Sequence, residues 1–173
     1  MIDRRGFFAS LADALNGLVG QLLWQPIAGP STGGALTVEL GRAVQRPVAP
    51  HPHPRLNPPS HQGESSLYIR CAWRVDNEDE VLTSSLDDNS LDGPMLRALR
   101  VLDRTTITAV SLRWPSCDLV LTLSGGVRLS IFCDQVDESD DDGDNYNLVL
   151  PGRAYIIGAK SIITVELRGG NTS

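Results

Sequence analysis

Residues 118–133 read DLVLTLSGGVRLSIFC, in which two runs of alternating apolar and polar residues flank a Gly-Gly pair. Alternation with a period of two is typical of strands that bury one face. Glycine adopts the positive φ angles that short hairpin connections require, so the pair at 125–126 marks the turn. The stretch therefore predicts a β-hairpin and, with it, an antiparallel sheet.

Seven other segments have strand-like patterns and predict the remaining strands, at 36–40, 67–75, 81–85, 107–114, 146–150, 155–157 and 162–167. Leucines recur at helical spacing within residues 3–25, which predicts a first helix capped by Asp3 and packed on the sheet. A second, short helix is predicted to be capped by Asp92, with Pro94 in its first turn. The predicted fold class is α+β: a mainly antiparallel sheet with an N-terminal helix and a second short helix.

The composition changes sharply between residues 46 and 64, which hold six prolines and all three histidines. Proline lacks an amide proton and fixes φ, so this segment is predicted to be an extended, solvated linker or a long loop. A length of 173 residues suits a single domain. We divide it into the helix and first strand (1–45), the Pro/His-rich segment (46–64), and the main sheet with the short helix (65–173).

Two parts of the chain have a similar order of elements: a helix, then strands, a glycine turn and a further strand. The alignment places Leu67-Ile69-Cys71 opposite Leu129-Ile131-Cys133. Because identity is low, an internal duplication and a chance similarity of amphipathic units both stay open. Duplication predicts two pseudo-repeated helix-plus-strands halves, and it makes the strand at 36–40 a hydrogen-bonded neighbour of the strand at 67–71.

Charge, hydropathy and cysteine content restrict the class of protein. A formal net charge of −6 argues against a nucleic-acid partner, because phosphate binding depends on clustered Lys and Arg. No run of 18 apolar residues is present, so no membrane-spanning helix is predicted. The three cysteines, Cys71, Cys117 and Cys133, are far apart in sequence, so no CxxC motif is present. Cys71 and Cys133 are interpreted as small buried hydrophobic residues. These features predict a cytoplasmic protein with reduced thiols.

The N-terminal residues 3–8, DRRGFF, resemble a twin-arginine export signal. Asp13 and Asn16, however, interrupt the apolar region that such a signal requires, and the leucines recur at helical spacing. We therefore favour a helix of the folded domain over an export signal.

The acidic segment 137–145, DESDDDGDN, comes nearest to a metal-binding motif. Placing Gly143 at the sixth position of an EF-hand loop puts Asp140 and Asp142 at ligand positions. Val149 then occupies the twelfth position, where the loop requires a bidentate Glu. A solvated loop is the favoured interpretation, and weak calcium binding is the alternative.

No catalytic motif is present. All three histidines lie in the Pro-rich segment, where nothing would hold a Ser–His pair or a metal site in a fixed geometry. A nucleophile elbow, a P-loop and a dinucleotide fingerprint are all missing from the sequence. Four carboxylates could converge in a paired-carboxylate hydrolase, although nothing in the sequence points to it: Glu39, Asp118, Asp134 and Glu166. We predict no enzymatic activity, no cofactor and no metal.

Contact with a protein partner is the role that the remaining polar and aromatic residues favour. The candidates are Arg70, Trp73, Arg74, Trp114, Asp140, Asp141 and Asp142. Trp and Arg near strand ends are typical interface anchors, although Trp73 also suits the core face of its strand. The surface carboxylates predict a basic partner.

Several stretches are similar to those of a family of small uncharacterised bacterial α+β proteins. They are LLW at 22–24, GALTVELG at 34–41, LYIRCAWR at 67–74, DLVLTLSGGVRLSIF at 118–132 and NYNL at 145–148. Some proteins of similar appearance are immunity partners of secreted toxins. The resemblance implies a non-catalytic, immunity-like protein-binding module. The alternatives are a structural or homo-oligomeric protein whose strand edges pair between subunits, and a small-molecule or calcium-binding protein.

Overall fold

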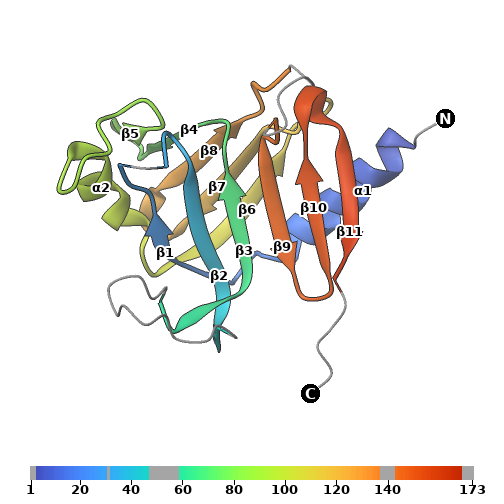
Figure 1. The fold of residues 1–173 in the computed structure, drawn as a ribbon, viewed down its shortest axis with the longest axis horizontal. Coiled ribbons are helices and arrows are strands. Elements are labelled where there is room, and N and C mark those ends of the chain that lie inside the picture. Colours follow the sequence, from blue (N-terminus) through green and yellow to red (C-terminus); the bar gives the residue numbers. More distant parts are fainter. Residues whose placement is uncertain (1–2, 31, 47–58, 137–142, 169–173) are drawn as a thin grey trace.

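The computed structural model describes residues 3–30, 32–46, 59–136 and 143–168. Within these ranges the chain forms strands, two α-helices and short 3₁₀ turns (Figure 1). The strands are β1 (Leu22–Ile27), β2 (Leu36–Gln45), β3 (His61–Ile69), β4 (Ala72–Asp76), β5 (Val81–Ser84), β6 (Thr105–Leu112), β7 (Leu119–Leu123), β8 (Arg128–Phe132), β9 (Tyr146–Leu150), β10 (Arg153–Ile157) and β11 (Ile163–Leu167). The helices are α1 (Arg4–Asn16) and α2 (Pro94–Leu99), and the 3₁₀ turns are η2 (Arg100–Leu102), η3 (Ser124–Gly126) and η4 (Ala159–Ser161).

All neighbouring strands are antiparallel and form one 11-stranded sheet in the order β11-β10-β9-β3-β2-β1-β6-β7-β8-β4-β5. The predicted hairpin at 118–133 is β7–β8, connected by η3. The predicted antiparallel sheet, N-terminal helix and short second helix are all observed. The α+β class is confirmed only in part, because the sheet dominates the fold.

The strand order is symmetric about the contact between β1 and β6. On one side lies the meander β1-β2-β3 and on the other the meander β6-β7-β8. They are joined where Leu22 pairs with Thr106 and Leu23 with Thr105, and where the amide of Ile107 donates to the carbonyl of Gln21. Beyond them, β9 pairs with β3, and β4 pairs with β8. The first half of the chain therefore adds its hairpin β4–β5 to the meander β6-β7-β8. The second half adds its hairpin β9–β10 to the meander β1-β2-β3. β11 is an extra edge strand, and the internal duplication stays a prediction.

The pairing of β2 with β3 confirms a specific prediction. Leu36 lies opposite Ile69 and Val38 opposite Leu67, although the Pro/His-rich segment separates the two strands in sequence. All four side chains are fully buried. The strands are neighbours because both present an unbroken apolar face to the same core.

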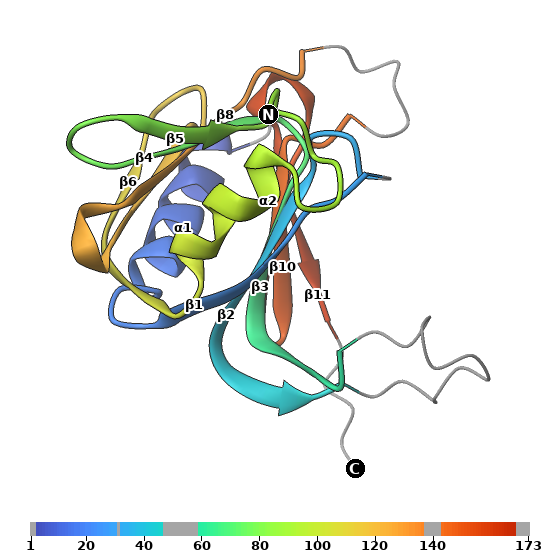
Figure 2. The ribbon, with the colours of Figure 1, turned by 90° about the vertical axis from the view of Figure 1, so that its left-hand side faces the viewer.

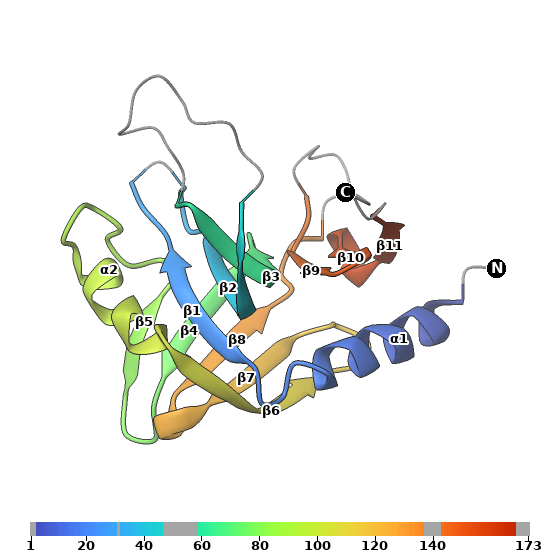
Figure 3. The ribbon, with the colours of Figure 1, turned by 90° about the horizontal axis from the view of Figure 1, so that it is seen from below.

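The sheet bends so that its two arms face each other, with the helices between them (Figure 2). Helix α1 packs against β6 and β11, and α2 packs against β5 at the opposite end of the molecule (Figure 3). The core consists of the inward-facing residues of both arms together with apolar residues of the helices. Its largest wholly buried side chains are Trp73, Tyr146 and Tyr155, and the helices contribute Leu11, Leu15, Met95 and Leu99.

The first helix is shorter than predicted. Asp3 caps it as expected, since its Oδ1 accepts a hydrogen bond of 2.9 Å from the amide of Gly6. The helix ends at Asn16 instead of continuing to residue 25, and Gly20 then adopts a φ of 88°, which reverses the chain. The following residues, predicted as helix, form β1 because they complete the meander with β2. In the second helix the N-cap is Gly93 instead of Asp92.

The predicted strand at 67–75 is two strands. β3 ends at Ile69 and β4 begins at Ala72, and between them the carbonyl of Asn145 accepts hydrogen bonds from the amides of Arg70 and Cys71. This corner lets the chain leave one arm of the sheet and enter the other. The predicted linker 46–64 is also shorter than expected, because β3 already begins at His61; residues 47–58 lie outside the described ranges.

Candidate functional site

Trp114 lies on the connection between β6 and β7 and is 41% exposed. Its ring meets that of Phe8 edge-to-face, with centroids 5.1 Å apart and an interplanar angle of 80°. The guanidinium carbon of Arg5 lies 5.8 Å from the centre of the indole ring. Both contacts are favourable geometries for an aromatic ring, so the side chain is held in place while much of it stays in water.

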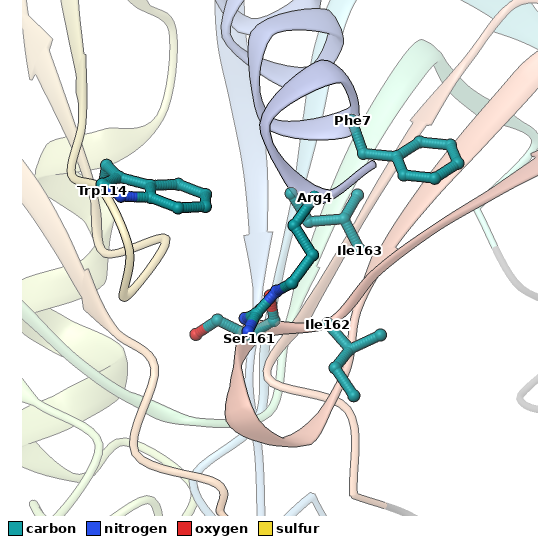
Figure 4. A pocket seen from close by; sticks show the side chains of 6 residues that line it. All are labelled: Arg4, Phe7, Trp114, Ser161, Ile162 and Ile163. Atoms are coloured by element: carbon teal, nitrogen blue, oxygen red, sulfur yellow. The ribbon is translucent and has the colours of Figure 1, made fainter. Parts of the chain in front are cut away.

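The first two turns of α1 and the η4 turn place further side chains beside Trp114. Figure 4 shows Arg4 and Ile162 at a shallow hollow between the indole and Phe7, whose ring points away from the indole. Phe7 and Ile162 are each more than a third exposed. We name this set the Trp114 surface; it consists of Arg4, Arg5, Phe7, Phe8, Trp114 and Ile162.

The amphipathic pattern of α1 explains why the helix presents these residues. Leu11 and Leu15 are wholly buried against the sheet, which orients the helix, and Phe8 is partly buried one turn before Leu11. The first turn is anchored by Arg4, whose Nη2 lies 3.1 Å from the carbonyl oxygen of Lys160. The same nitrogen lies 3.5 Å from the carbonyl oxygen of Ser161. The arginine side chain thereby links the start of α1 to η4.

The Trp114 surface is locally positive in an acidic chain. The ion pairs among the described residues join Arg42 to Glu64, Arg46 to Glu39, and both Arg74 and Arg128 to Asp76. None of those pairs uses Arg4 or Arg5. No carboxylate in these pairs neutralises either charge, but Nη2 of Arg4 is already held by the carbonyls of Lys160 and Ser161, and Arg5 lies against the indole.

An open groove of about 550 Å³ runs along the opposite side of α1. In it the hydroxyls of Ser10 and Tyr155 are 2.8 Å apart, and Nη1 of Arg153 donates to the Tyr155 hydroxyl at 3.4 Å. These polar groups satisfy one another, and Tyr155 is fully buried. The groove therefore offers fewer groups for recognition than the Trp114 surface does.

The residues predicted from sequence to bind a partner do not form one cluster. Trp114 is central to the Trp114 surface, whereas Arg74 lies on β4, where its guanidinium stacks over Phe132 at 5.6 Å and contacts Asp76 at 3.1 Å. Arg70 is partly exposed at the β3–β4 corner. Asp140, Asp141 and Asp142 lie outside the described residues.

Trp73 is a core residue. It is 1% exposed and donates a hydrogen bond of 2.6 Å from Nε1 to the carbonyl of Gly34. A partner cannot reach this side chain, so the core interpretation left open by the sequence holds, and Trp73 is withdrawn as a partner contact. The difference from Trp114 arises because Trp73 points between the arms of the bent sheet, while Trp114 lies beyond the end of β6.

The four carboxylates considered for a hydrolase do not converge. Glu39 is buried on β2, and Glu166 is exposed on the edge strand β11. Asp118 accepts a hydrogen bond from the amide of Cys133, and Asp134 accepts one from the amide of Ala72. Within the described ranges, no group of three or more His, Cys, Asp or Glu residues could hold a metal ion.

Sequence reasoning missed Arg4, Arg5, Phe7 and Ile162 as site residues. The signal for the first three was present in residues 3–8, DRRGFF, which the sequence patterns interpret as an export motif or as the start of a helix and not as a binding surface. In the structure these residues begin α1, and the pattern of two arginines followed by two aromatics supplies most of the Trp114 surface. Ile162 carried no comparable signal, because only the tertiary fold brings η4 beside α1.

No family model, no curated protein and no solved structure matches the chain. The resemblance to small bacterial α+β proteins therefore stays an expectation. None of the helices in the described ranges has the length and apolar character needed to cross a membrane.

Proposed function

We propose that the protein is a non-catalytic protein-binding module and that the Trp114 surface is its interface. The observation that carries the proposal is the state of Trp114: its indole is 41% exposed and is fixed by Phe8 on one side and Arg5 on another. Trp and Arg are the residue types that most often dominate binding energy at protein interfaces.

An exposed side chain that is held in one position is better suited to an interface than an exposed side chain that rotates freely in solvent. Binding normally costs roughly 0.5–1.5 kcal/mol for each side chain that loses its freedom on association. The edge-to-face contact with Phe8 and the guanidinium of Arg5 already restrict Trp114 in the free protein. A partner would therefore meet a preorganised anchor with exposed Phe7 and Ile162 beside it.

The charges specify the chemistry of the partner at this surface. Arg4 and Arg5 favour carboxylates on the partner, close to an apolar side chain that covers the indole. The basic partner predicted from Asp140, Asp141 and Asp142 would bind a different segment of the chain, and that binding remains a proposal. An immunity-like role, in which the module holds a secreted toxin, combines both: a basic region of the toxin binds the acidic segment 137–145, and an acidic patch of the toxin binds the Trp114 surface.

Replacing Trp114 with alanine is expected to weaken partner binding by at least about 30-fold, or ~2 kcal/mol. Phe132→Ala is the matched control, because Phe132 is also an exposed aromatic (38%) with an arginine over its ring, but it lies on β8 outside the Trp114 surface. Wild type and both variants would be immobilised in parallel, and proteins captured from the cell of origin would be quantified and titrated.

A partner retained by wild type and Phe132→Ala but lost by Trp114→Ala supports the proposal. Proteins retained equally by all three, or lost only by Phe132→Ala, would contradict it. Circular dichroism of each variant checks that the fold is intact.

A homo-oligomer is the second candidate function, and the free edges of the sheet favour it. β5 and β11 each pair with one neighbour only, and Val81 on β5 is 58% exposed. Unpaired strand edges can pair with a second copy of the chain. Light scattering over a concentration series should then show a dimer, and Thr164→Lys on β11 should shift the equilibrium to monomer if that edge is used. A monomer at the highest concentration would eliminate this candidate.

A further inference from the structure

The fold brings together all three cysteines of the chain, which are far apart in sequence. Sγ of Cys133 lies 3.4 Å from the carbonyl oxygen of Cys117, and the Tyr146 hydroxyl donates to that oxygen at 3.0 Å. The side chains of Cys71 and Cys133 lie close enough to interact with each other. All three cysteines are free thiols in this structure.

The register of β4 and β8 places Cys71 directly opposite Cys133. Ala72 pairs with Phe132 and Trp73 with Ile131, so the next pair along the ladder is Cys71 with Cys133. Both cysteines lie on the inner face of the sheet, two residues from Trp73 and Ile131, which are buried.

The backbone hydrogen bonds show which kind of antiparallel pair this is. The amide of Cys71 donates to the carbonyl of Asn145, and the amide of Cys133 donates to Oδ1 of Asp118. Neither amide bonds across to the opposite cysteine, as in a non-hydrogen-bonded pair. In such pairs the Cα atoms are about 4.5 Å apart, inside the roughly 4.4–6.8 Å range that a disulfide spans.

We propose that Cys71 and Cys133 are a disulfide-forming pair, which joins the two halves of the chain where they exchange hairpins. Cys71 lies between β3 and β4, and Cys133 follows β8 before the chain reaches β9. At Cys71 the chain leaves the meander β1-β2-β3 to pair with β8, and after Cys133 it leaves the meander β6-β7-β8 to pair with β3. The bond would therefore tie both crossing connections together.

Cys117 does not compete for this bond. Its thiol points toward the carbonyl of Pro115, with Sγ 3.9 Å from that oxygen, and its own carbonyl is the group that faces Cys133. Burial raises the pKa of the Cys117 thiol to about 11. Its position, and not its pKa, separates Cys117 from the pair, because the pKa of Cys133 is raised as well.

Oxidation requires an electron acceptor, and a low-molecular-weight disulfide such as oxidised glutathione supplies it. Cys133 is the more exposed partner and reacts first. Its thiol releases a proton to water, the thiolate attacks one sulfur of glutathione disulfide, and one glutathione leaves as a thiolate that is protonated. The Cys71 thiol loses its proton and attacks Cys133 Sγ, and the second glutathione leaves. One S–S bond is broken, one is formed, and two glutathione thiols are produced.

Proton loss limits the rate of this exchange. The interaction with the Cys71 side chain, followed by burial, raises the pKa of Cys133 far above its ordinary value. Because the thiolate is the attacking species, the rate should increase roughly tenfold for each pH unit below that pKa. Closing a loop of about 60 residues should also raise the Tm of the oxidised protein by roughly 10 °C.

The test treats the folded, full-length protein with oxidised glutathione at pH 8 and pH 9 until the products stop changing, followed by acid quenching and alkylation. Peptide mapping without reduction should find Cys71 linked to Cys133 and Cys117 alkylated, with faster formation at pH 9. A predominant bond to Cys117, a reaction that stops at Cys133–glutathione, or three alkylated cysteines would each overturn the proposal.

Variants provide an independent measurement. Cys117→Ala should keep both the cross-link and the rise in Tm, whereas Cys71→Ala should retain glutathione on Cys133 and show no such rise. Should Cys71→Ala fail to fold, the peptide map of the wild-type protein still decides the question. An equal rise in Tm for wild type and Cys71→Ala would contradict the proposed bond.

Discussion

Replacing Trp73 with alanine is expected to lower the free energy of unfolding by about 3–5 kcal/mol. The indole is almost fully buried, and its removal leaves a cavity between the two arms of the sheet. The carbonyl of Gly34 would also lose the hydrogen bond that it accepts from Nε1 at 2.6 Å. This is the largest destabilisation that we expect from any single tryptophan of the chain.

Urea unfolding followed by circular dichroism would measure the effect. Trp114→Ala is the matched control, because it removes the same number of atoms from a side chain that is 41% exposed, and we expect it to cost less than half as much. If Trp73→Ala unfolded at the same urea concentration as Trp114→Ala, the assignment of Trp73 to the core would be wrong. The comparison also separates the stabilising tryptophan from the one proposed to bind a partner.

Replacing Glu39 with alanine is expected to lower the free energy of unfolding by about 3 kcal/mol. Glu39 is 4% exposed on β2, where Oε2 accepts a hydrogen bond of 2.8 Å from the amide of Gly63 and Oε1 lies 3.5 Å from Nη2 of Arg46. In Glu39→Ala the buried amide and the largely buried guanidinium both lose their partner. Glu39→Gln keeps an acceptor for the amide and should cost about 1 kcal/mol, the smaller penalty of a lost charge.

Glu64→Ala is the control for this second prediction. Glu64 lies on β3 and forms an ion pair of 3.3 Å with Arg42, but the arginine side chain is 80% exposed, so the pair should contribute less than about 1 kcal/mol. Chemical denaturation of all three variants at neutral pH provides the comparison. Equal effects of Glu39→Ala and Glu64→Ala would show that burial does not govern the strength of these pairs.

The proposed interface and the proposed disulfide share no residue and can fail separately, although the Cys117 carbonyl that faces Cys133 lies only three residues from Trp114. Trp114 and the first turns of α1 form the interface, whereas Cys71 and Cys133 lie at the corner between β4, β8 and β9. Loss of partner binding in Trp114→Ala says nothing about the cysteines.

Local pattern was sufficient to predict most strands, because the period of two reports directly on burial of one face. The hairpin at 118–133 and the strands near the C-terminus needed no knowledge of distant residues. The same pattern failed at residues 67–75, where an unbroken alternation hides a corner at Arg70 and Cys71. That corner exists because the carbonyl of Asn145 accepts hydrogen bonds from both amides, and Asn145 is more than 70 positions away.

By itself, therefore, the sequence determined most of the strands, although not β1, and that the sheet is antiparallel; it predicted that β2 and β3 are neighbours only if the two halves are duplicated. Only the tertiary structure decided that the halves exchange hairpins, that Trp73 is buried while Trp114 is exposed, and that DRRGFF forms a surface beside Ile162. It also decided that Cys71 faces Cys133. The physical reason is that alternation reports how a strand is buried, whereas strand partners, side-chain exposure and thiol contacts depend on which distant segments pack against it.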